Sequence, residues 1–213
     1  MKKTVSFWGQ KKILNYLSKS RNKYDDLYLG EKILLNNFFK KKTSVLDIGC
    51  SQGGFVSILR SMNRDFKYLG FDFNQKALSI AKKKYPLGNF KKINDNNYSK
   101  YTKKKYDLVI IFGILHLNKD WKKIVTEAFK VTKKYLIFDL RETDKKILKK
   151  IMMKIKGDKN SIPYFVHHEK KVKNFFYSNF KKRKLIKISY KGKPTKYCNY
   201  KSEIIFSNYC LYK

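Results

Sequence analysis

The chain has 213 residues, of which 42% are hydrophobic and 16% aromatic. That is enough for one sizeable core and short for two independent domains. No apolar run approaches the roughly 20 residues of a membrane-spanning helix, so we expect neither a membrane span nor a signal peptide. The three cysteines form no Cys-x-x-Cys pair. This argues against a zinc site or a disulfide framework and favours a reducing, cytoplasmic setting.

The formal net charge is +35, from 51 basic and 16 acidic residues. Clustered cations bind nucleic acid by releasing counterions from phosphates. However, only five of the basic residues are arginine. Proteins that bind bases and phosphates specifically favour arginine, because its guanidinium group donates two parallel hydrogen bonds. The lysines are also spread through nearly every segment of the chain. We interpret the charge mainly as compositional drift, which still predicts nonspecific binding to polyanions.

The predicted elements alternate between short β-rich runs and amphipathic helices. Residues 1–41 are expected to form a helical arm or lid with two helices, and residues 42–213 the main domain. Strands are predicted at 44–49, 67–72, 89–93, 106–112 and 134–140, with helices at 54–62, 74–84 and 120–131 between them. A helix from about Thr143 to Ile155, a loop, and a helix at 169–180 follow, and strands at 185–190 and 203–212 end the chain. The pattern predicts an α/β sandwich of three layers around a mostly parallel seven-stranded sheet with a C-terminal antiparallel pair.

A glycine-rich turn follows the first predicted strand, in the run VLDIGCSQGGF from Val45 to Phe55. Glycines at such a turn accept positive φ, and the next helix presents unpaired N–H groups to a ligand. Asp72 ends the second strand, where a carboxylate can accept both hydroxyls of a ribose, and Asp95 and Asn96 follow the third. Because the carboxyl ends of parallel strands meet at one edge of a sheet, these residues are expected to share one ligand site.

The run VLDIGCSQGG, with Asp72, Asp95 and the block from Tyr106 to Asp139, resembles the class I S-adenosylmethionine-dependent methyltransferases. The resemblance implies a Rossmann-like fold and S-adenosylmethionine as cofactor. No metal is expected, because no second Cys/His pair accompanies His167 and His168. The residues it implies at the cofactor are Asp47, Gly49, Cys50, Ser51 and Gly53 for the methionine moiety, Asp72 and Phe73 for the ribose, Asp95 and Asn96 for the adenine, and Phe112 and Gly113 beside the sulfonium.

The chain departs from that family's pattern at Ser51, where the family usually has a glycine. We expect serine to follow the turn if its φ stays negative, with its hydroxyl capping the next helix or meeting the ligand carboxylate.

The nearest alternative for such a turn is a dinucleotide-dependent dehydrogenase. That class spaces its glycines as Gly-x-Gly-x-x-Gly, and a carboxylate at Asp47 would repel a pyrophosphate. A methyltransferase is therefore favoured over a dehydrogenase. It is also favoured over a protein that keeps this fold but has lost the ability to bind a ligand.

Residues for the methyl acceptor are harder to identify. His116, after the fourth strand, could deprotonate or orient a hydroxyl, or merely bond the adjoining loop. Tyr24 and Tyr28 could face the site from the arm. Asp139 and Arg141 end the fifth strand, and the arginine could bind an acidic group of the acceptor or form a surface ion pair with Glu142 or Asp144.

These observations predict methyl transfer to an oxygen, in preference to a nitrogen, of a small molecule or saccharide precursor. The motifs of exocyclic-amine and cytosine methyltransferases are missing from the expected positions. The charge keeps two alternatives open: an RNA methyltransferase, and a noncatalytic nucleic-acid-binding protein with the same fold. The oligomeric state stays open.

Overall fold

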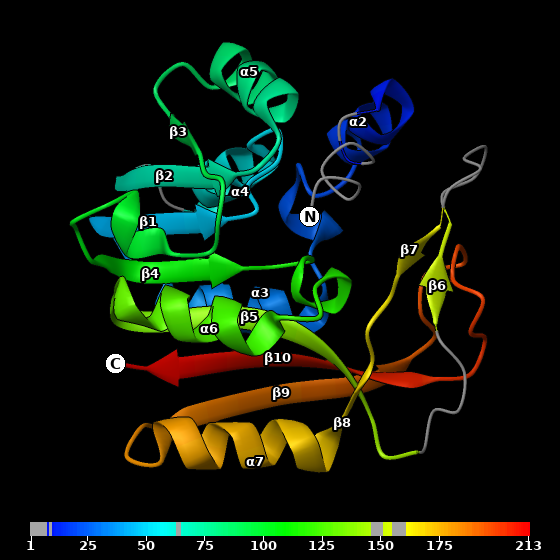
Figure 1. Cartoon of the computed structure of the whole chain (residues 1–213). Helices are drawn as coiled ribbons and strands as arrows, with labels where there is room; N and C mark the ends of the chain where they lie inside the picture. Colours follow the sequence, from blue (N-terminus) through cyan, green and yellow to red (C-terminus); the bar gives the residue numbers. More distant parts are fainter. Residues whose placement is uncertain (1–7, 9, 63–64, 146–150, 155–160) are drawn as a thin grey trace.

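The computed structural model describes residues 8, 10–62, 65–145, 151–154 and 161–213 (Figure 1). Over these residues eight strands form one sheet in the order β3-β2-β1-β4-β5-β10-β9, with β8 paired to β5. The strands are β1 (Thr43–Ile48), β2 (Phe66–Asp72), β3 (Asn89–Lys92), β4 (Tyr106–Ile111), β5 (Thr132–Thr143), β8 (His167–His168), β9 (Leu185–Gly192) and β10 (Ile204–Tyr212). β1 to β5 are parallel, and β10 runs antiparallel to both β5 and β9. The predicted fold class is confirmed.

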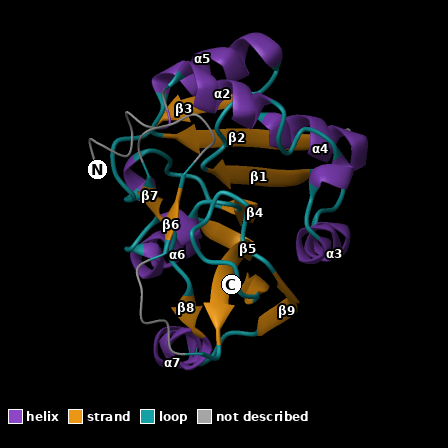
Figure 2. Cartoon of the chain, turned by 90° about the vertical axis from the view of Figure 1, so that its right-hand side faces the viewer, coloured by secondary structure: helices purple, strands orange, loops and turns teal. Residues whose placement is uncertain are grey.

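Helices cover both faces of this sheet (Figure 2). One layer holds α3 (Leu29–Phe38), α4 (Gly54–Met62) and α5 (Gln75–Lys84), and the other holds α6 (Trp121–Lys130) and α7 (Glu169–Phe180). Alternate residues of the central strands pack into two different cores. In β4, Val109 packs with α6 and α7, while Leu108 and Ile110 pack with α3 and α4. The period of two along each strand therefore builds two hydrophobic cores on one sheet.

The N-terminal arm divides between two places. α3 packs on β10 and β5 and so belongs to one helix layer. α2 (Lys11–Ser18) contributes Ile13 to a third cluster with Met153 of β6 (Met152–Met153), Ile162 of β7 (Ile162–Pro163) and Phe206. Figure 1 shows α2, β6 and β7 beyond the arrowheads of the parallel strands, which is the edge where the predicted site lies.

The helix predicted from about Thr143 to Ile155 is wrong over its described part. β5 continues to Thr143, and β6 pairs antiparallel with β7. Ile151 and Met153 are buried while Met152 is half-buried, so the burial alternates with a period of two. Pairing with β7, and a bridge from Met153 to Cys198, override the local helix preference. Residues 146–150 and 155 of this prediction lie outside the described residues.

Among the described residues, no helix has both the length and the apolar character needed to cross a membrane.

Candidate functional site

The turn between β1 and α4 is built on three positive φ angles. They are +85° at Gly49, +49° at Ser51 and +75° at Gly53. A Cβ on Gly49 would lie 2.8 Å from Ile114, and one on Gly53 would lie 2.9 Å from Phe90. Both glycines are therefore required by conformation and by packing, as the sequence predicted for a tight turn at the end of the first strand.

The expectation that Ser51 keeps a negative φ is wrong. Its φ of +49° lies in the left-handed region that favours glycine. The serine thus occupies the same backbone conformation that a glycine would, so the turn keeps its path. Its N–H donates to Asp72 Oδ2 at 2.8 Å, which joins the turn to the end of β2.

Cys50 has its polar groups engaged within the turn. Its N–H donates to Phe71 O, and its carbonyl accepts from Gly53 N. The side chain is buried, with Sγ 2.7 Å from where a Cβ on Gly70 would lie. Burial raises the pKa of the thiol well above its usual value. Cys50 therefore stabilises the turn through its backbone hydrogen bonds and the packing of its buried side chain.

Asp47, two residues before Gly49, is almost completely buried. It is 5% exposed, and its Oδ2 accepts a hydrogen bond of 2.6 Å from the Tyr68 hydroxyl. Burial raises the pKa of Asp47 to about 7, and the Tyr68 hydrogen bond only partly opposes this. A carboxyl held in this state gains from a cationic neighbour, which would favour its ionised form.

Asp72, at the end of β2, is half-buried, and two backbone N–H groups orient its carboxylate. Oδ1 accepts from Asn74 N and Oδ2 from Ser51 N, both at 2.8 Å. Burial raises its pKa, and these backbone donors oppose the shift. Each carboxylate oxygen has two lone pairs, so both retain capacity for a ribose hydroxyl. Phe73, the next residue, is half-buried against the α6 core.

Asp95 and Asn96 lie after β3, the neighbour of β2 in the sheet. The Asp95 side chain is 46% exposed, its Oδ1 accepts from Asn97 N, and Lys100 Nζ lies 3.5 Å from its Oδ2. The Asn97 N–H lowers the pKa of this carboxyl. Asn96 Oδ1 accepts from the Tyr98 hydroxyl. Both residues thus reach the predicted edge, with Asp95 more exposed than Asp72.

Phe112 and Gly113 follow β4, and Gly113 is fixed by a buried acid. Gly113 has φ +76°, and its N–H donates to Asp139 Oδ1 at 2.6 Å. Asp139 is completely buried and forms an ion pair of 2.6 Å with Arg141 Nη1. The surface ion pairs predicted for Arg141 with Glu142 or Asp144 do not form. Glu142 instead accepts from the Tyr209 hydroxyl and pairs with Lys187.

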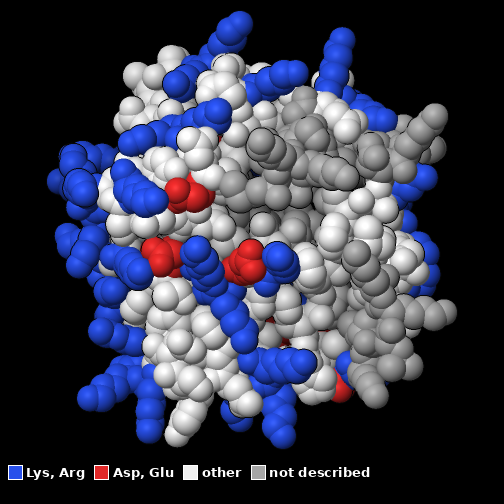
Figure 3. All heavy atoms as spheres, viewed as in Figure 1, with Lys and Arg blue, Asp and Glu red and all other residues white. Residues whose placement is uncertain are grey.

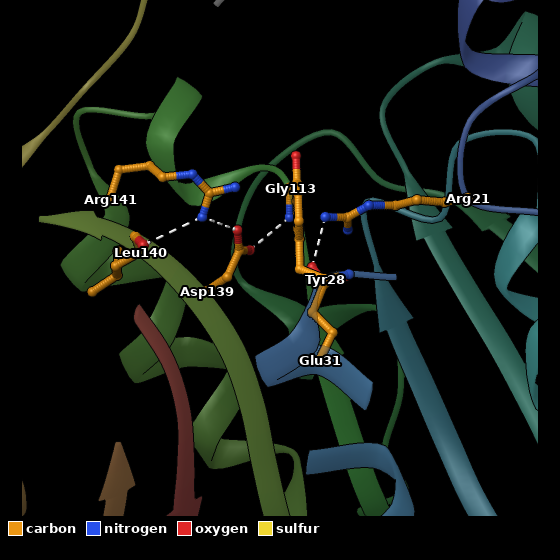
Figure 4. Close-up of polar contacts among 7 residues, drawn as sticks. All are labelled: Arg21, Tyr28, Glu31, Gly113, Asp139, Leu140 and Arg141. Carbon is orange, nitrogen blue, oxygen red and sulfur yellow. Dashed lines mark hydrogen bonds and ion pairs between the residues drawn. The ribbon is translucent and has the colours of Figure 1, made fainter. Parts of the chain in front are cut away.

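A second arginine reaches the same place. Arg21 Nη2 pairs at 2.6 Å with Oε1 of Glu31, which is fully buried in α3. Figure 4 shows Arg21 and Arg141 entering from opposite sides, with the Tyr28 ring between them. The Tyr28 ring centroid lies 5.4 Å from Arg21 Cζ and 5.6 Å from Arg141 Cζ. Arg21 and Glu31 were not predicted as site residues. The available signal was the scarcity of arginine in a chain rich in lysine.

His116 lies on a short 3₁₀ helix (Leu115–Leu117) beside this arginine pair. The residue is 8% exposed, its ring centroid lies 4.8 Å from that of Tyr164, and Nδ1 has no hydrogen-bond partner among the described residues. Burial, with Arg141 nearby, lowers its pKa to about 3. The imidazole is therefore neutral at pH 7.

Tyr24 does not lie at this site. It forms a 3₁₀ turn (Tyr24–Asp26) before α3, and its hydroxyl accepts from Asn36 Nδ2. It borders a cavity of about 520 Å³ with Ser61 and Met62, which end α4 at the opposite edge of the sheet. Only Tyr28 of the two tyrosines predicted on the arm approaches Arg141.

Metal ligands do not gather in the described part of the chain: no group there of three or more His, Cys, Asp or Glu side chains could hold an ion. His168 caps α7 through Nδ1, and the ring centroid of His167 lies 5.1 Å from that of Trp121.

Fold and site together define a Rossmann-like α/β protein with a nucleoside-type site at the carboxyl ends of its parallel strands. The chain belongs to the methyltransferase domain family, whose model matches residues 39–188. It is 32% identical over 113 residues to 235L of Invertebrate iridescent virus 6, a protein named as a candidate methyltransferase. That match covers 53% of this chain and 39% of the viral protein, so the chain spans less than half of that relative.

Solved structures share the fold at low sequence identity. The plantazolicin methyltransferase BamL, in complex with a desmethyl plantazolicin analogue and SAH, is 14% identical with a TM-score of 0.63, covering 99% of this chain and 90% of its own. An S-adenosylmethionine-dependent methyltransferase of Clostridium acetobutylicum is 14% identical with a TM-score of 0.59, covering 99% and 98%. Magnesium protoporphyrin IX methyltransferase of Synechocystis, with bound SAH, is 14% identical with a TM-score of 0.57, covering 85% and 78%.

The left-handed conformation of Ser51 leads to a prediction for stability. Ser51→Gly should raise the free energy of unfolding by up to about 1 kcal/mol, because relief of the left-handed strain exceeds the added entropy of the unfolded chain. Ser51→Val should lower it by about 1–2 kcal/mol. Urea denaturation measures both. The matched control is Ser178→Gly in α7, where the same change in an exposed helix should destabilise by about 0.5 kcal/mol. Destabilisation by Ser51→Gly would contradict the assigned conformation.

The buried carboxyl of Asp47 leads to a prediction for pH dependence. Because its pKa in the folded chain is about 7, above the ordinary value of 3.8, the folded state holds a proton that the unfolded state releases. The stability is therefore lost as the pH rises from about 4 to 7, by up to about 1.4 kcal/mol per pH unit. Asp47→Asn should flatten this slope in urea denaturation at several pH values. Asp25→Asn, at a carboxylate that is 94% exposed, is the matched control. An equal slope in wild type and Asp47→Asn would refute the effect.

Proposed function

We propose that this chain binds S-adenosylmethionine and transfers its methyl group to an oxygen, in preference to a nitrogen, of a small molecule or saccharide precursor. The observation that carries the proposal is the positive-φ turn at Gly49, Ser51 and Gly53 joined directly to Asp72. Membership of the methyltransferase domain family and the SAH-bound structural neighbours support it.

The residues at the site fit the parts of this cofactor. Asp47 is a buried carboxyl that an ammonium group would stabilise, whereas a pyrophosphate would be repelled. Asp72 is held by two backbone N–H groups with acceptor capacity left for two ribose hydroxyls. Phe112 is buried beside the turn, with its ring centroid 5.8 Å from that of Phe55. A cationic ligand with a ribose matches this set of groups.

Bound S-adenosylmethionine would supply a methyl group on a positively charged sulfur, open to attack by an acceptor lone pair. The protein's part is to align the acceptor and exclude water. With a pKa of about 3, His116 is a weak base at neutral pH. We therefore propose that His116 orients the acceptor hydroxyl through its unpaired Nδ1, and that the hydroxyl proton leaves to water or to the acceptor's own groups.

The arm is proposed to close over the cofactor. Gln52 Nε2, in the turn, donates to Leu14 O of α2 at 2.6 Å. Asn74 Nδ2, just after β2, donates to Trp8 O at 2.7 Å. These two hydrogen bonds tie residues of the arm to both sides of the proposed cofactor position, which is what a lid requires. A reducing, cytoplasmic setting stays part of the proposal, since the three cysteines are free and buried.

The role of Asp72 is tested by titration calorimetry with S-adenosylhomocysteine. Asp72→Ala should weaken binding by about 1.5–3 kcal/mol, because charge-assisted hydrogen bonds to the ribose are lost. The matched control is Asp107→Ala at the start of β4, where the carboxylate also holds backbone and side-chain groups of Ser44 but at the opposite edge. That variant should lose stability and keep its affinity. Equal affinity of wild type and Asp72→Ala would remove Asp72 from the site, and no binding by wild type would overturn the function.

The class of acceptor is tested with S-adenosylmethionine labelled in its methyl group and a cell extract fractionated into small molecules, RNA and protein. Label should enter the small-molecule fraction. Figure 3 shows many lysine and arginine side chains, gathered mainly along the left and lower edges of the visible face, and few acidic ones, so binding to RNA without label is expected from charge alone. Label in RNA would favour the RNA methyltransferase. Polyanion binding with no affinity for S-adenosylhomocysteine would favour a noncatalytic nucleic-acid-binding protein.

A further inference from the structure

Two arginines distant in sequence converge where β4 and β5 end. Arg21 comes from the arm and Arg141 from β5, and Tyr28 lies between them (Figure 4). Arg141 Cζ also lies 4.4 Å from the ring centroid of Phe206, which is 5.6 Å from that of Tyr28, so the two rings form one aromatic surface beside this guanidinium group. We name Arg21, Tyr28, Arg141 and Phe206 the arginine pocket wall. A guanidinium group that packs against aromatic rings keeps its hydrogen-bonding edges available for a ligand.

The acids beside these arginines neutralise them only in part. Burial acts to raise the pKa of Asp139, but Arg141, Arg21 and the Gly113 N–H together outweigh it, so this pKa is lowered and Asp139 is charged. Burial raises the pKa of Glu31 to about 7, which Arg21 opposes only in part. Two permanent positive charges therefore face one full and one partial negative charge at neutral pH. The surplus favours a singly charged anion.

Three buried polar atoms here have no hydrogen-bond partner among the described residues. They are Arg141 Nε, His116 Nδ1 and the Tyr190 hydroxyl. Tyr190 stacks on Phe206 at 5.3 Å between centroids. Burial raises the pKa of Tyr190 to about 12 and lowers that of His116 to about 3, and Arg141 lies close enough for its charge to oppose the first shift and add to the second. An unpaired buried polar group destabilises the folded chain, so such a cluster indicates a ligand that supplies the missing partners. Arg141 Nε is solely a donor and requires an oxygen with free lone pairs.

Resting on the proposed function, we propose that Arg141, assisted by Arg21, binds a carboxylate group carried by the methyl acceptor. The carboxylate takes the unpaired Nε edge of Arg141, and the rest of the acceptor lies toward His116 and Gly113. Arg141 is 3% exposed whereas Tyr28 is 42% exposed. The Tyr28 ring therefore moves aside to admit the acceptor and then packs against it.

A carboxylate fits better than a phosphate monoester. Asp139 and Glu31 stand beside the arginines, and each would repel the second charge of a phosphate. Like charges a few ångströms apart repel strongly where little water screens them. The general lysine charge does not explain the preference, because it would favour the more highly charged ligand.

The test is a ligand-observed NMR titration of the full chain saturated with S-adenosylhomocysteine, at about 150 mM salt to screen the lysines. The probes are benzoate and hexanoate with their neutral amides, benzamide and hexanamide, and phenyl phosphate. We expect each acid to bind at least tenfold more tightly than its amide. Arg141→Gln should abolish this preference, and Arg21→Gln should reduce it.

Arg183→Gln is the matched control, because Arg183 is exposed beyond the end of α7 and loses the same charge. It should keep the full preference. Arg141→Gln leaves Asp139 buried and unpaired, so the double variant Asp139→Asn/Arg141→Gln is measured beside it. Far-UV circular dichroism and a cooperative urea transition show that both are folded.

Three outcomes would overturn the inference: no preference for the acids in wild type, a preference that survives in the double variant, or phenyl phosphate binding more tightly than benzoate. Failure of wild type to bind S-adenosylhomocysteine would instead overturn the proposed function. The acid and amide titrations without that ligand would still decide whether the arginine pocket wall binds carboxylates.

Discussion

The site depends on one buried carboxylate, that of Asp139. It accepts the N–H of Gly113 and pairs with Arg141, so it joins the loop after β4 to the end of β5. A charge with no exposure to water is tolerated only with a partner of opposite sign and satisfied hydrogen bonds, and removal of the partner from a buried pair costs about 3–5 kcal/mol. Buried Asp139 therefore requires a cation next to it, and Arg141 supplies this cation beside the loop that would face a bound sulfonium. Packing and function are served by the same pair of side chains.

The other side of the site, which is formed by the turn after β1, is determined by backbone conformation. Gly49 and Gly53 are required by Ile114 and Phe90, which belong to the protein itself, so a tight turn alone is no evidence of a ligand. The coupling of the Ser51 N–H to Asp72 is more informative. A carboxylate oriented by two backbone donors, at the carboxyl end of a parallel strand, is positioned for the ribose contact that we propose. The turn and Asp72 therefore act as one unit.

The sequence predicted the sheet well because each central strand carries a local signal, an apolar run bounded by turns. β6 carried none, since two residues are too few to show a period, and its pairing depends on Ile162 and Cys198 far along the chain. The φ of Ser51 was missed for a similar reason: a left-handed serine is held by Asp72, which is 21 residues away. Arg21 and Glu31 were missed because their partnership joins a loop to a helix, and no spacing rule predicts that Arg21 would reach Gly113.

The distribution of cations clarifies what the charge of +35 means. Lysines cover the surface and pair weakly, as Lys32 does with an exposed Asp25 at 3.5 Å. The two arginines of the site each pair at 2.6 Å with a buried acid. At these two positions a planar fork meets a carboxylate without water, which suits arginine better than lysine, since an ammonium group is more strongly hydrated. The long-range field of the lysines governs encounter with any polyanion, and salt screens it. Recognition at the arginine pocket wall acts over a few ångströms in a desolvated place, so it can discriminate among acceptors even on a surface that attracts every anion.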